Sequence, residues 1–162
     1  MSKKYLVIFI LPIIILYACS KSDSNYGNCV STGGIPTSAE MADLEKYISS
    51  KGITATKDSR GFYYQITNPG YGVSAPTNAS TVQVKYKGTL TNGTIFDSTA
   101  TGETRIFSLG GVVLGWQYGV PLIKKTGVID LYLPPSLGYG CTGSSSIPAS
   151  SITIFHIELI NY

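Results

Sequence analysis

Residues 82–98 read VQVKYKGTLTNGTIFDS, and this stretch decides the fold. Apolar and polar residues alternate over 82–87, which predicts a strand with one buried and one solvated face. Asn92-Gly93 is typical of a type I′ hairpin turn, so the chain should fold back on itself there. The returning segment carries an acid, Asp97, directly after Phe96. The stretch therefore predicts two antiparallel strands and a carboxylate in an apolar setting.

The sequence on either side extends this pattern into a sheet. A brief helix fits between Gly115 and Ile123, where Pro121 limits its length. No repeat or second domain boundary interrupts the pattern. The fold class is therefore α+β, an antiparallel sheet of about five strands curled around one short helix, over residues 61–162. Further strands with period-two alternation are expected at 62–66, 104–109, 128–133 and 152–160.

A helical extension is predicted before this domain, over residues 37–60. Thr37-Ser38-Ala39-Glu40 forms a capping box, in which a hydroxyl and a carboxylate satisfy free amides of the first turn. Apolar residues recur at helical spacing from Met41 to Ile48, and Gly52 provides the left-handed residue that ends the helix. We expect this extension to pack against the sheet or to space the domain from a membrane, rather than to take part in catalysis.

The N-terminus has the layout of a secretory signal over residues 1–18. Two lysines precede an apolar run that is too short to cross a bilayer as a helix. The run ends in Leu16-Tyr17-Ala18-Cys19, which resembles the bacterial lipobox, although Tyr17 is larger than usual at its position. The resemblance implies cleavage before Cys19, a diacylglycerol on its thiol and a fatty acid such as palmitate on its new amino group. The alternative is an ordinary signal peptide or a short anchor helix, with Cys19 incidental.

Lipidation would export the protein and anchor it to a bacterial membrane. Residues 19–36 are then a flexible, lipidated tether, and several acyl chains on one cysteine give a stable anchor. We expect the outer membrane, with the domain facing either the periplasm or the exterior. In such a compartment Cys29 and Cys141 can form a disulfide, and two unpaired thiols are the alternative.

The charge balance argues against a nucleic acid as partner. The chain holds 12 Lys and Arg against 9 Asp and Glu. Loss of residues 1–18 would remove two lysines and no acid, which leaves a nearly neutral chain with scattered basic residues. Such a chain has no basic patch with which to follow a phosphate backbone.

Most catalytic chemistries lack their residues in this chain. The sole histidine, His156, falls on the polar face of the last predicted strand beside Glu158, so it should be exposed to solvent. A Ser-His-Asp or Cys-His mechanism therefore has no base apart from it. The chain has neither a Cys-x-x-Cys pair for zinc nor a glycine motif for nucleotides, and its acids are isolated. We expect no metal and no cofactor, and a hydrophobic pocket with a few polar groups.

Three ordered segments resemble the FKBP-type peptidyl-prolyl cis/trans isomerases. Each is a weak match alone, but the ordered set is specific and spans residues 61–162. The resemblance implies an FKBP-like sheet and an enzyme that accelerates X-Pro bond rotation in exported, proline-containing polypeptides. It also favours a monomer that works without metal or cofactor. The segments are VKYKG (84–88) with FDS (96–98), FSLG (107–110) with VVLGW (112–116), and LGYG (137–140) with IP (147–148) and IFHIEL (154–159).

The resemblance also implies the residues of an active site. Trp116 would floor the pocket, Tyr139 and the backbone amide of Val113 would donate to a substrate carbonyl, and Asp97 would be the polar group on the rim. The alternative for each apolar residue is plain core packing, whereas an acid in a buried stretch needs a partner. The implied catalytic residues are Tyr86, Phe96, Asp97, Val113, Trp116, Tyr139 and Phe155, and the further pocket walls are Phe107, Val112 and Ile147.

The chain departs from the family pattern near this pocket. Arg105 falls where many relatives have a second pocket aromatic, Gly110-Gly111 is about two residues short, and the loop at 144–146 is polar. These departures weaken the expectation that macrolides such as rapamycin bind. They also favour the alternative function, a low-turnover chaperone or assembly module that holds proline-containing segments on the same fold. A structural lipoprotein that merely reuses the fold would show a degraded pocket, and the pocket residues are retained.

Overall fold

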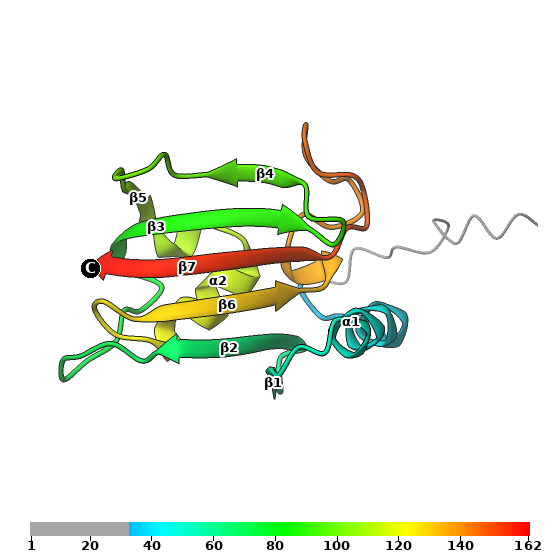
Figure 1. The fold of residues 1–162 in the computed structure, drawn as a ribbon, viewed down its shortest axis with the longest axis horizontal. Helices are drawn as coiled ribbons and strands as arrows, with labels where there is room; N and C mark the ends of the chain where they lie inside the picture. Colours follow the sequence, from blue (N-terminus) through cyan, green and yellow to red (C-terminus); the bar gives the residue numbers. More distant parts are fainter. Residues whose placement is uncertain (1–32) are drawn as a thin grey trace, which may run out of the picture.

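The computed structural model describes residues 33–162, which form one curled antiparallel sheet with a helix on each face (Figure 1). The strand order is β1-β2-β6-β7-β3-β4, and β5 also pairs with β3. The predicted signal sequence, Cys19 and Cys29 lie outside the described residues. The elements are α1 (Ser38–Ser50), β1 (Thr56–Asp58), β2 (Phe62–Asn68), β3 (Thr81–Leu90), β4 (Ile95–Ser98), β5 (Arg105–Ser108), η1 (Leu109–Gly111), α2 (Leu114–Gly119), η2 (Val120–Leu122), β6 (Val128–Leu133), η3 (Pro135–Leu137) and β7 (Thr153–Asn161).

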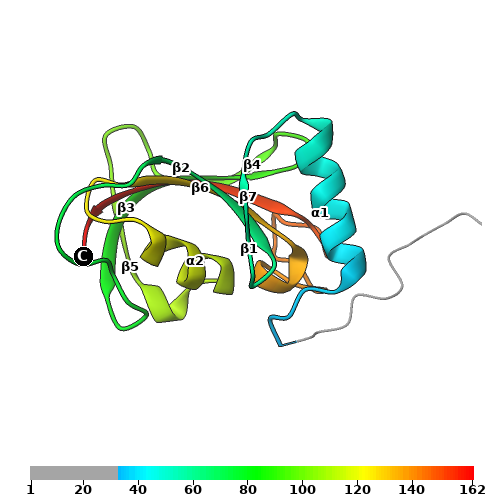
Figure 2. The ribbon, with the colours of Figure 1, turned by 90° about the horizontal axis from the view of Figure 1, so that it is seen from below.

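The core lies between the concave face of the sheet and α2 (Figure 2). Alternate residues of β3 and β7, such as Val84 and Ile157, are fully buried, as the period of two predicts. Two glycines of α2 allow the helix to sit close to β6. A Cβ on Gly115 would lie 2.3 Å from Leu133 Cδ1, so a larger residue would push α2 off the sheet.

Helix α1 packs against the opposite face of the sheet. The predicted capping box is present, since Glu40 N donates to Thr37 Oγ1 at 3.2 Å and Thr37 N donates to Glu40 Oε2 at 2.7 Å. Gly52, with φ of +61°, ends the helix as expected. Buried side chains on one face of α1 form a small second cluster with Tyr132 of β6. The helix is therefore docked on the domain through its own apolar face.

Residues 37–60 are not wholly helical. Strand β1 follows α1 and pairs with β2 in the register Thr56 to Tyr64, so the sheet continues into the predicted extension. This short strand carries no run of β-branched or alternating residues, and its pairing with β2 rather than its own sequence sets its conformation. The sheet has seven strands rather than about five.

The hairpin between β3 and β4 has a different turn from the predicted type I′. That turn requires a positive φ at both central residues, and only Gly93 has one, at +87°. Gly93 N donates to Leu90 O at 2.9 Å, and Thr94 N donates to the Asn92 side chain at 3.0 Å. Asn92 therefore acts through its side-chain oxygen rather than through a left-handed backbone.

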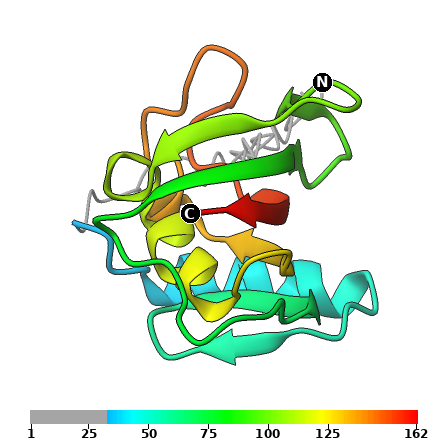
Figure 3. The same ribbon diagram turned by 90° about the vertical axis from the view of Figure 1, so that its left-hand side faces the viewer.

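No helix among residues 33–162 is both long and apolar enough to cross a membrane. The long loop that follows η3, drawn in orange, rises beside β4 (Figure 1 and Figure 3). This arrangement places Tyr139 of the loop next to Phe96 of β4, with ring centroids 6.0 Å apart. The sheet, α2 and this loop together enclose the candidate site.

Candidate active site

A cavity of about 250 Å³ opens between α2, the concave face of the sheet and the loop after η3. Its lining is mainly aromatic and aliphatic, with one carboxylate and two hydroxyls. Such a composition is typical of a pocket that binds an apolar group and orients it with a few polar contacts. The lining residues are Tyr86, Asp97, Phe107, Gly111, Val112, Val113, Trp116, Tyr139 and Phe155.

Trp116 lies at the centre of this aromatic wall. Its ring meets those of Tyr86, Phe107 and Phe155 edge to face, with centroids 5.3, 5.7 and 5.4 Å apart. Edge-to-face contacts of this kind stabilise the cluster beyond simple area burial. Trp116 is only 3% exposed, so the indole gives the cavity a rigid floor from which water is largely excluded.

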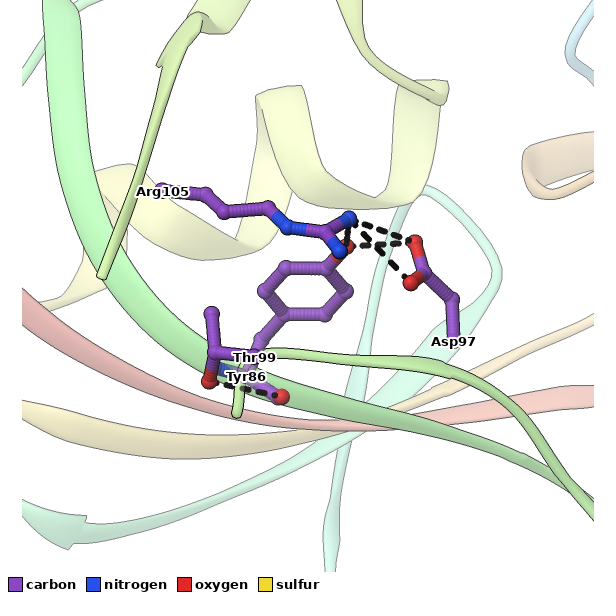
Figure 4. Close-up of polar contacts among 4 residues, drawn as sticks. All are labelled: Tyr86, Asp97, Thr99 and Arg105. Atoms are coloured by element: carbon purple, nitrogen blue, oxygen red, sulfur yellow. Dashed lines mark hydrogen bonds and ion pairs between the residues drawn. The ribbon is translucent and has the colours of Figure 1, made fainter. Parts of the chain in front are cut away.

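Tyr86, Asp97 and Arg105 form one polar cluster beside the cavity (Figure 4). The Tyr86 hydroxyl donates to Asp97 Oδ2, and Arg105 Nη1 donates to the Tyr86 hydroxyl at 2.9 Å and to Asp97 Oδ1 at 3.2 Å. Burial, followed by the hydrogen bond to Asp97, raises the pKa of Tyr86 to about 12. The hydroxyl therefore keeps its proton at neutral pH and its lone pair is occupied by Arg105.

Thr99 fixes the segment that carries Asp97 onto β3. Its backbone amide donates to Tyr86 O at 3.0 Å, and Tyr86 N donates to Thr99 Oγ1 at 3.2 Å (Figure 4). These contacts continue the pairing of β4 with β3 past Ser98, the last residue of the strand. Asp97 is therefore held by backbone on both sides, although its side chain is half exposed.

Apart from the fully buried Nε1 of Trp116, two hydrogen-bond donors at the cavity have no acceptor within residues 33–162. The Tyr139 hydroxyl and the Val113 amide both border the cavity, and neither donates to another described group. Burial, and then the charge of Asp97, raise the pKa of Tyr139, so its hydroxyl stays protonated. The site therefore offers two free donors to a ligand oxygen.

Eight of the ten residues predicted for the pocket line this cavity. Phe96 does not line the cavity. Its ring packs edge to face against that of Phe155, which does, with the ring centroids 5.4 Å apart. Ile147 is buried in the loop after η3 and does not line the cavity. His156 is exposed, as predicted, and its Nδ1 lies 2.7 Å from Asp130 Oδ1 on the far face of the sheet.

The sequence alone did not show the contacts of Arg105, Thr99 and Gly111. Arg105 lies two residues before Phe107 on β5, so strand alternation alone places both side chains on the pocket side. No sequence pattern indicates the bond between Thr99 and Tyr86, because it joins residues from two elements. Within residues 33–162 no group of His, Cys, Asp and Glu could hold a metal ion.

A larger hollow of about 650 Å³ lies between α1, the tip of the β3–β4 hairpin and the end of the loop after η3. It is lined mostly by small polar residues and prolines, such as Thr91, Asn92 and Pro148, and it contains no aromatic ring. We therefore place the candidate site in the smaller cavity, because it combines an aromatic lining with hydrogen-bond donors that are free to bind a ligand.

Known proteins resemble the part of the chain that forms this cavity. The family model of the FKBP-type peptidyl-prolyl cis-trans isomerases matches residues 72–160. The chain is 43% identical to FkpA of Escherichia coli over 118 residues, which are 72% of this chain and 43% of that protein. It is 44% identical to FkpA of Buchnera aphidicola over 119 residues, 73% of this chain and 46% of that protein. The chain thus spans less than half the length of these curated relatives.

Solved structures show the same likeness in three dimensions. The crystal structure of FkpA from Escherichia coli aligns with a TM-score of 0.67 at 41% identity, over 76% of this chain and 57% of that one. A peptidyl-prolyl cis-trans isomerase from Pseudomonas syringae aligns with a TM-score of 0.66 at 26% identity, over 78% of this chain and 95% of that one. The curled antiparallel sheet with one short helix is therefore shared with structures of the FKBP class. The chain belongs to the FKBP-type peptidyl-prolyl cis-trans isomerase family.

Proposed function

We propose that the protein is a peptidyl-prolyl cis/trans isomerase that acts on X-Pro bonds of exported polypeptides. One observation carries this proposal: a buried aromatic cavity borders two free donors, the Tyr139 hydroxyl and the Val113 amide. Membership of the family supports it, and so does the absence of a nucleophile–base pair in the cavity lining. The reaction needs no such pair.

The chemistry follows from the amide bond itself. Resonance gives the peptide bond a rotation barrier of about 18–20 kcal/mol, and rotation requires that resonance to be lost. The twisted amide has less charge separation than the planar one, so it loses less when it is moved out of water. A dry cradle of aromatic rings therefore stabilises the twisted state more than the ground state, which is the requirement for catalysis.

Each of these cavity residues would have its own role in the reaction. The proline ring would rest on the indole of Trp116, while Tyr139 and the Val113 amide would hold a substrate carbonyl during rotation. Arg105 and the Tyr86 hydroxyl give the carboxylate of Asp97 its partners, so no unpaired charge faces the proline ring. Trp116 would set the shape of the pocket and Tyr139 the orientation of the peptide.

A proline isomerisation assay on the chain tests this function. We expect the cis/trans relaxation of a short X-Pro peptide to accelerate in proportion to enzyme concentration. Tyr139→Phe, which keeps the ring, should lower that rate. An uncatalysed rate together with measurable peptide binding would instead support the second candidate below.

The second candidate is a low-turnover module that binds proline-containing segments as a chaperone or assembly factor. The ion pair of Arg105 with Asp97 favours it, because Asp97 already has its hydrogen bonds in the absence of a substrate. Peptide affinity measured through the fluorescence of Trp116, the sole tryptophan, separates this candidate from an enzyme when it is compared with the isomerisation rate. An enzyme must show turnover as well as binding.

We propose that the mature chain is lipid-anchored through Cys19 in the outer membrane, exposed to the periplasm or the exterior. The support is the Leu16-Tyr17-Ala18-Cys19 motif after a short apolar run. Cys19→Ser should prevent fatty-acid labelling in a bacterial host and should leave the protein unprocessed or in the soluble fraction. A wild-type protein that takes up no labelled fatty acid would overturn the anchor.

We also propose that Cys29 pairs with Cys141. Cys141 follows Tyr139-Gly140 in the loop beside the cavity, so the bridge would tie the tether to the site. In the chain-entropy model, a disulfide that closes a loop of this length stabilises the folded state by about 4–5 kcal/mol. Two titratable thiols in the denatured, unreduced mature chain would rule the bridge out.

Arg105 also bears on macrolide binding. We propose weak binding of rapamycin-type macrolides, because Arg105 replaces an aromatic pocket wall with a charged side chain. We also propose that the protein is a monomer. Titration of rapamycin against Trp116 fluorescence measures the first, and sedimentation equilibrium measures the second. Tight macrolide binding would show that Arg105 does not restrict the pocket.

A further inference from the structure

Glu40 of α1 joins the helix to the segment that carries Tyr139. Ser136 N donates to Glu40 Oε1 at 2.9 Å, and Ser136 Oγ lies 2.7 Å from both carboxylate oxygens. The same carboxylate accepts from Thr37 N at 2.7 Å in the capping box. One partly buried side chain therefore satisfies donors from two elements that are 96 residues apart in sequence.

η3 needs such an acceptor because of its own sequence. It begins with Pro134 as the N-cap and Pro135 as the first residue, and no side chain of its own caps it. Neither proline has an N–H, so Ser136 carries the first amide of this short helix. Glu40, which is distant in sequence, accepts the hydrogen bond from that amide, so it caps η3 as well as α1.

The backbone around Tyr139 is attached to η3. Pro135 O accepts from Gly138 N at 2.9 Å and from Gly140 N at 2.8 Å, one residue on each side of Tyr139. Leu137 is fully buried in the main core and holds η3 from its other side. The direction in which Tyr139 leaves the backbone therefore depends on the position of η3.

We propose that Glu40 is a positioning residue, which acts through Ser136 to hold Tyr139 against the cavity. Helix α1 lies outside the family match at residues 72–160, so this contact adds a residue from the extension to the isomerase site. We expect the extension to pack against the sheet or to space the domain from a membrane, and the proposed contact adds support of the site to these roles. The kinetic part of the proposal rests on the proposed isomerase function.

A double-mutant cycle with Tyr139→Phe separates positioning from general destabilisation. If Glu40 acts through the Tyr139 hydroxyl, Glu40→Ala should lower kcat/KM about tenfold in the wild-type background, since small misplacements of a catalytic group are costly. In the Tyr139→Phe background the same change should cost less than about twofold, because the hydroxyl is already absent. Glu40→Gln, which keeps one acceptor oxygen, should be intermediate.

Thr37→Ala is the matched control. It removes the hydroxyl half of the capping box and weakens the start of α1 without touching Ser136. Its kcat/KM should stay within about twofold of wild type. Ser136→Ala leaves the capping box whole and removes the hydroxyl bond to Glu40, so it should follow Glu40→Ala in direction. This second variant keeps the test valid if Glu40→Ala fails to fold.

Hydrogen exchange supplies a readout that does not need activity. The Gly138 and Gly140 amides should exchange faster in Glu40→Ala and keep wild-type protection in Thr37→Ala. Independent effects of Glu40→Ala and Tyr139→Phe, or equal losses from Thr37→Ala, would overturn the proposal. Unchanged exchange at both glycines would overturn it as well. If the wild type has no turnover, the proposed function fails, and exchange together with the same cycle on peptide affinity still decides the role of Glu40.

Discussion

Arg105 on β5 lies in an ion pair with Asp97 on β4, with Nη1 3.2 Å from Oδ1. Both strands pair with β3, so the ion pair joins its two outer partners beside the cavity. Arg105 also lies over the ring of Tyr86, with Cζ 5.8 Å from the ring centroid. Its side chain is 51% exposed and that of Asp97 is 46% exposed. Because an ion pair this exposed contributes little to stability, we expect Arg105 to affect selectivity instead.

We predict that Arg105→Phe changes which peptides are turned over. An aromatic ring there would extend the apolar wall, so kcat/KM for a peptide with a bulky apolar residue before proline should rise about threefold to tenfold. For a peptide with glutamate before proline, kcat/KM should fall, because the guanidinium that would attract the glutamate is absent. The ratio of kcat/KM values for the two peptides measures the change.

Arg105→Lys is the control for this prediction, since it keeps the charge and loses the planar group. Its peptide ratio should stay close to wild type. The free energy of unfolding should change by less than about 1 kcal/mol in both variants, because half-exposed ion pairs contribute little. An unchanged ratio in Arg105→Phe would show that the side chain does not border the bound peptide.

Tyr139→Phe should reduce catalysis without unfolding the domain. The hydroxyl has no acceptor among the described residues, so its loss removes a contact to substrate and no contact within the protein. Loss of one such bond corresponds to about 1–2 kcal/mol, or roughly fivefold to thirtyfold in kcat/KM. Thermal unfolding should match wild type. Equal activity of the two proteins would remove Tyr139 from the mechanism.

The effect of a substitution at Asp97 depends on whether an acceptor oxygen remains. Its carboxylate accepts from both the Tyr86 hydroxyl and Arg105, so Asp97→Ala would leave two donors without their acceptor. Asp97→Asn keeps an acceptor oxygen and the shape of the side chain. We expect Asp97→Asn to lower kcat/KM and Asp97→Ala to lower both kcat/KM and the free energy of unfolding, measured with urea.

Gly88 provides a test of how tightly the rings pack. A Cβ there would lie 2.4 Å from Cε2 of Phe96 and 3.1 Å from Cε1 of Phe155. Gly88→Ala must therefore displace Phe96, and overpacking of this kind costs about 1–3 kcal/mol of stability. Gly111→Ala, where a Cβ meets no atom within 4 Å, is the control for stability. Equal unfolding free energies for the two variants would contradict the tight packing.

Local patterns in the sequence predicted the parts of the fold that depend on neighbouring residues. The alternation over 82–87 gave β3, Thr37 and Glu40 gave the start of α1, and Gly52 gave its end. These features are set by strand period, side-chain caps and backbone conformation within a few residues. The pocket came from the resemblance to the family, because no single segment contains it.

Apart from the turn at Asn92-Gly93, the features that the sequence did not predict join distant segments. Glu40 caps η3 because residues 134 and 135 are prolines, and nothing near Glu40 in the sequence indicates this contact. The partners of Arg105 depend on how β4 and β5 both pair with β3. Strand β1 forms because β2 offers it an edge, although its own residues favour no strand. Such contacts are decided by tertiary packing, which local propensity does not encode.

The hydroxyl of Tyr86 should make the stability of the domain depend on pH in the alkaline range. Its pKa is raised to about 12 in the folded protein, first by burial and then by Asp97, whereas an unfolded tyrosine titrates near 10. The folded state therefore holds the proton more tightly than the unfolded state does. The stability from this difference is complete below about pH 10 and is lost as the pH rises through about 12.

We therefore expect the free energy of unfolding to fall above pH 10, by about 1 kcal/mol per pH unit for Tyr86 alone. Urea titrations followed by Trp116 fluorescence at a series of pH values measure the slope. Tyr86→Phe removes the ionisable hydroxyl, so its curve should be lower at neutral pH and flatter between pH 10 and 12. Tyr139, whose pKa is also raised, contributes to the slope that remains. Parallel curves for wild type and Tyr86→Phe would show that Tyr86 ionises at the same pH in the folded and unfolded states.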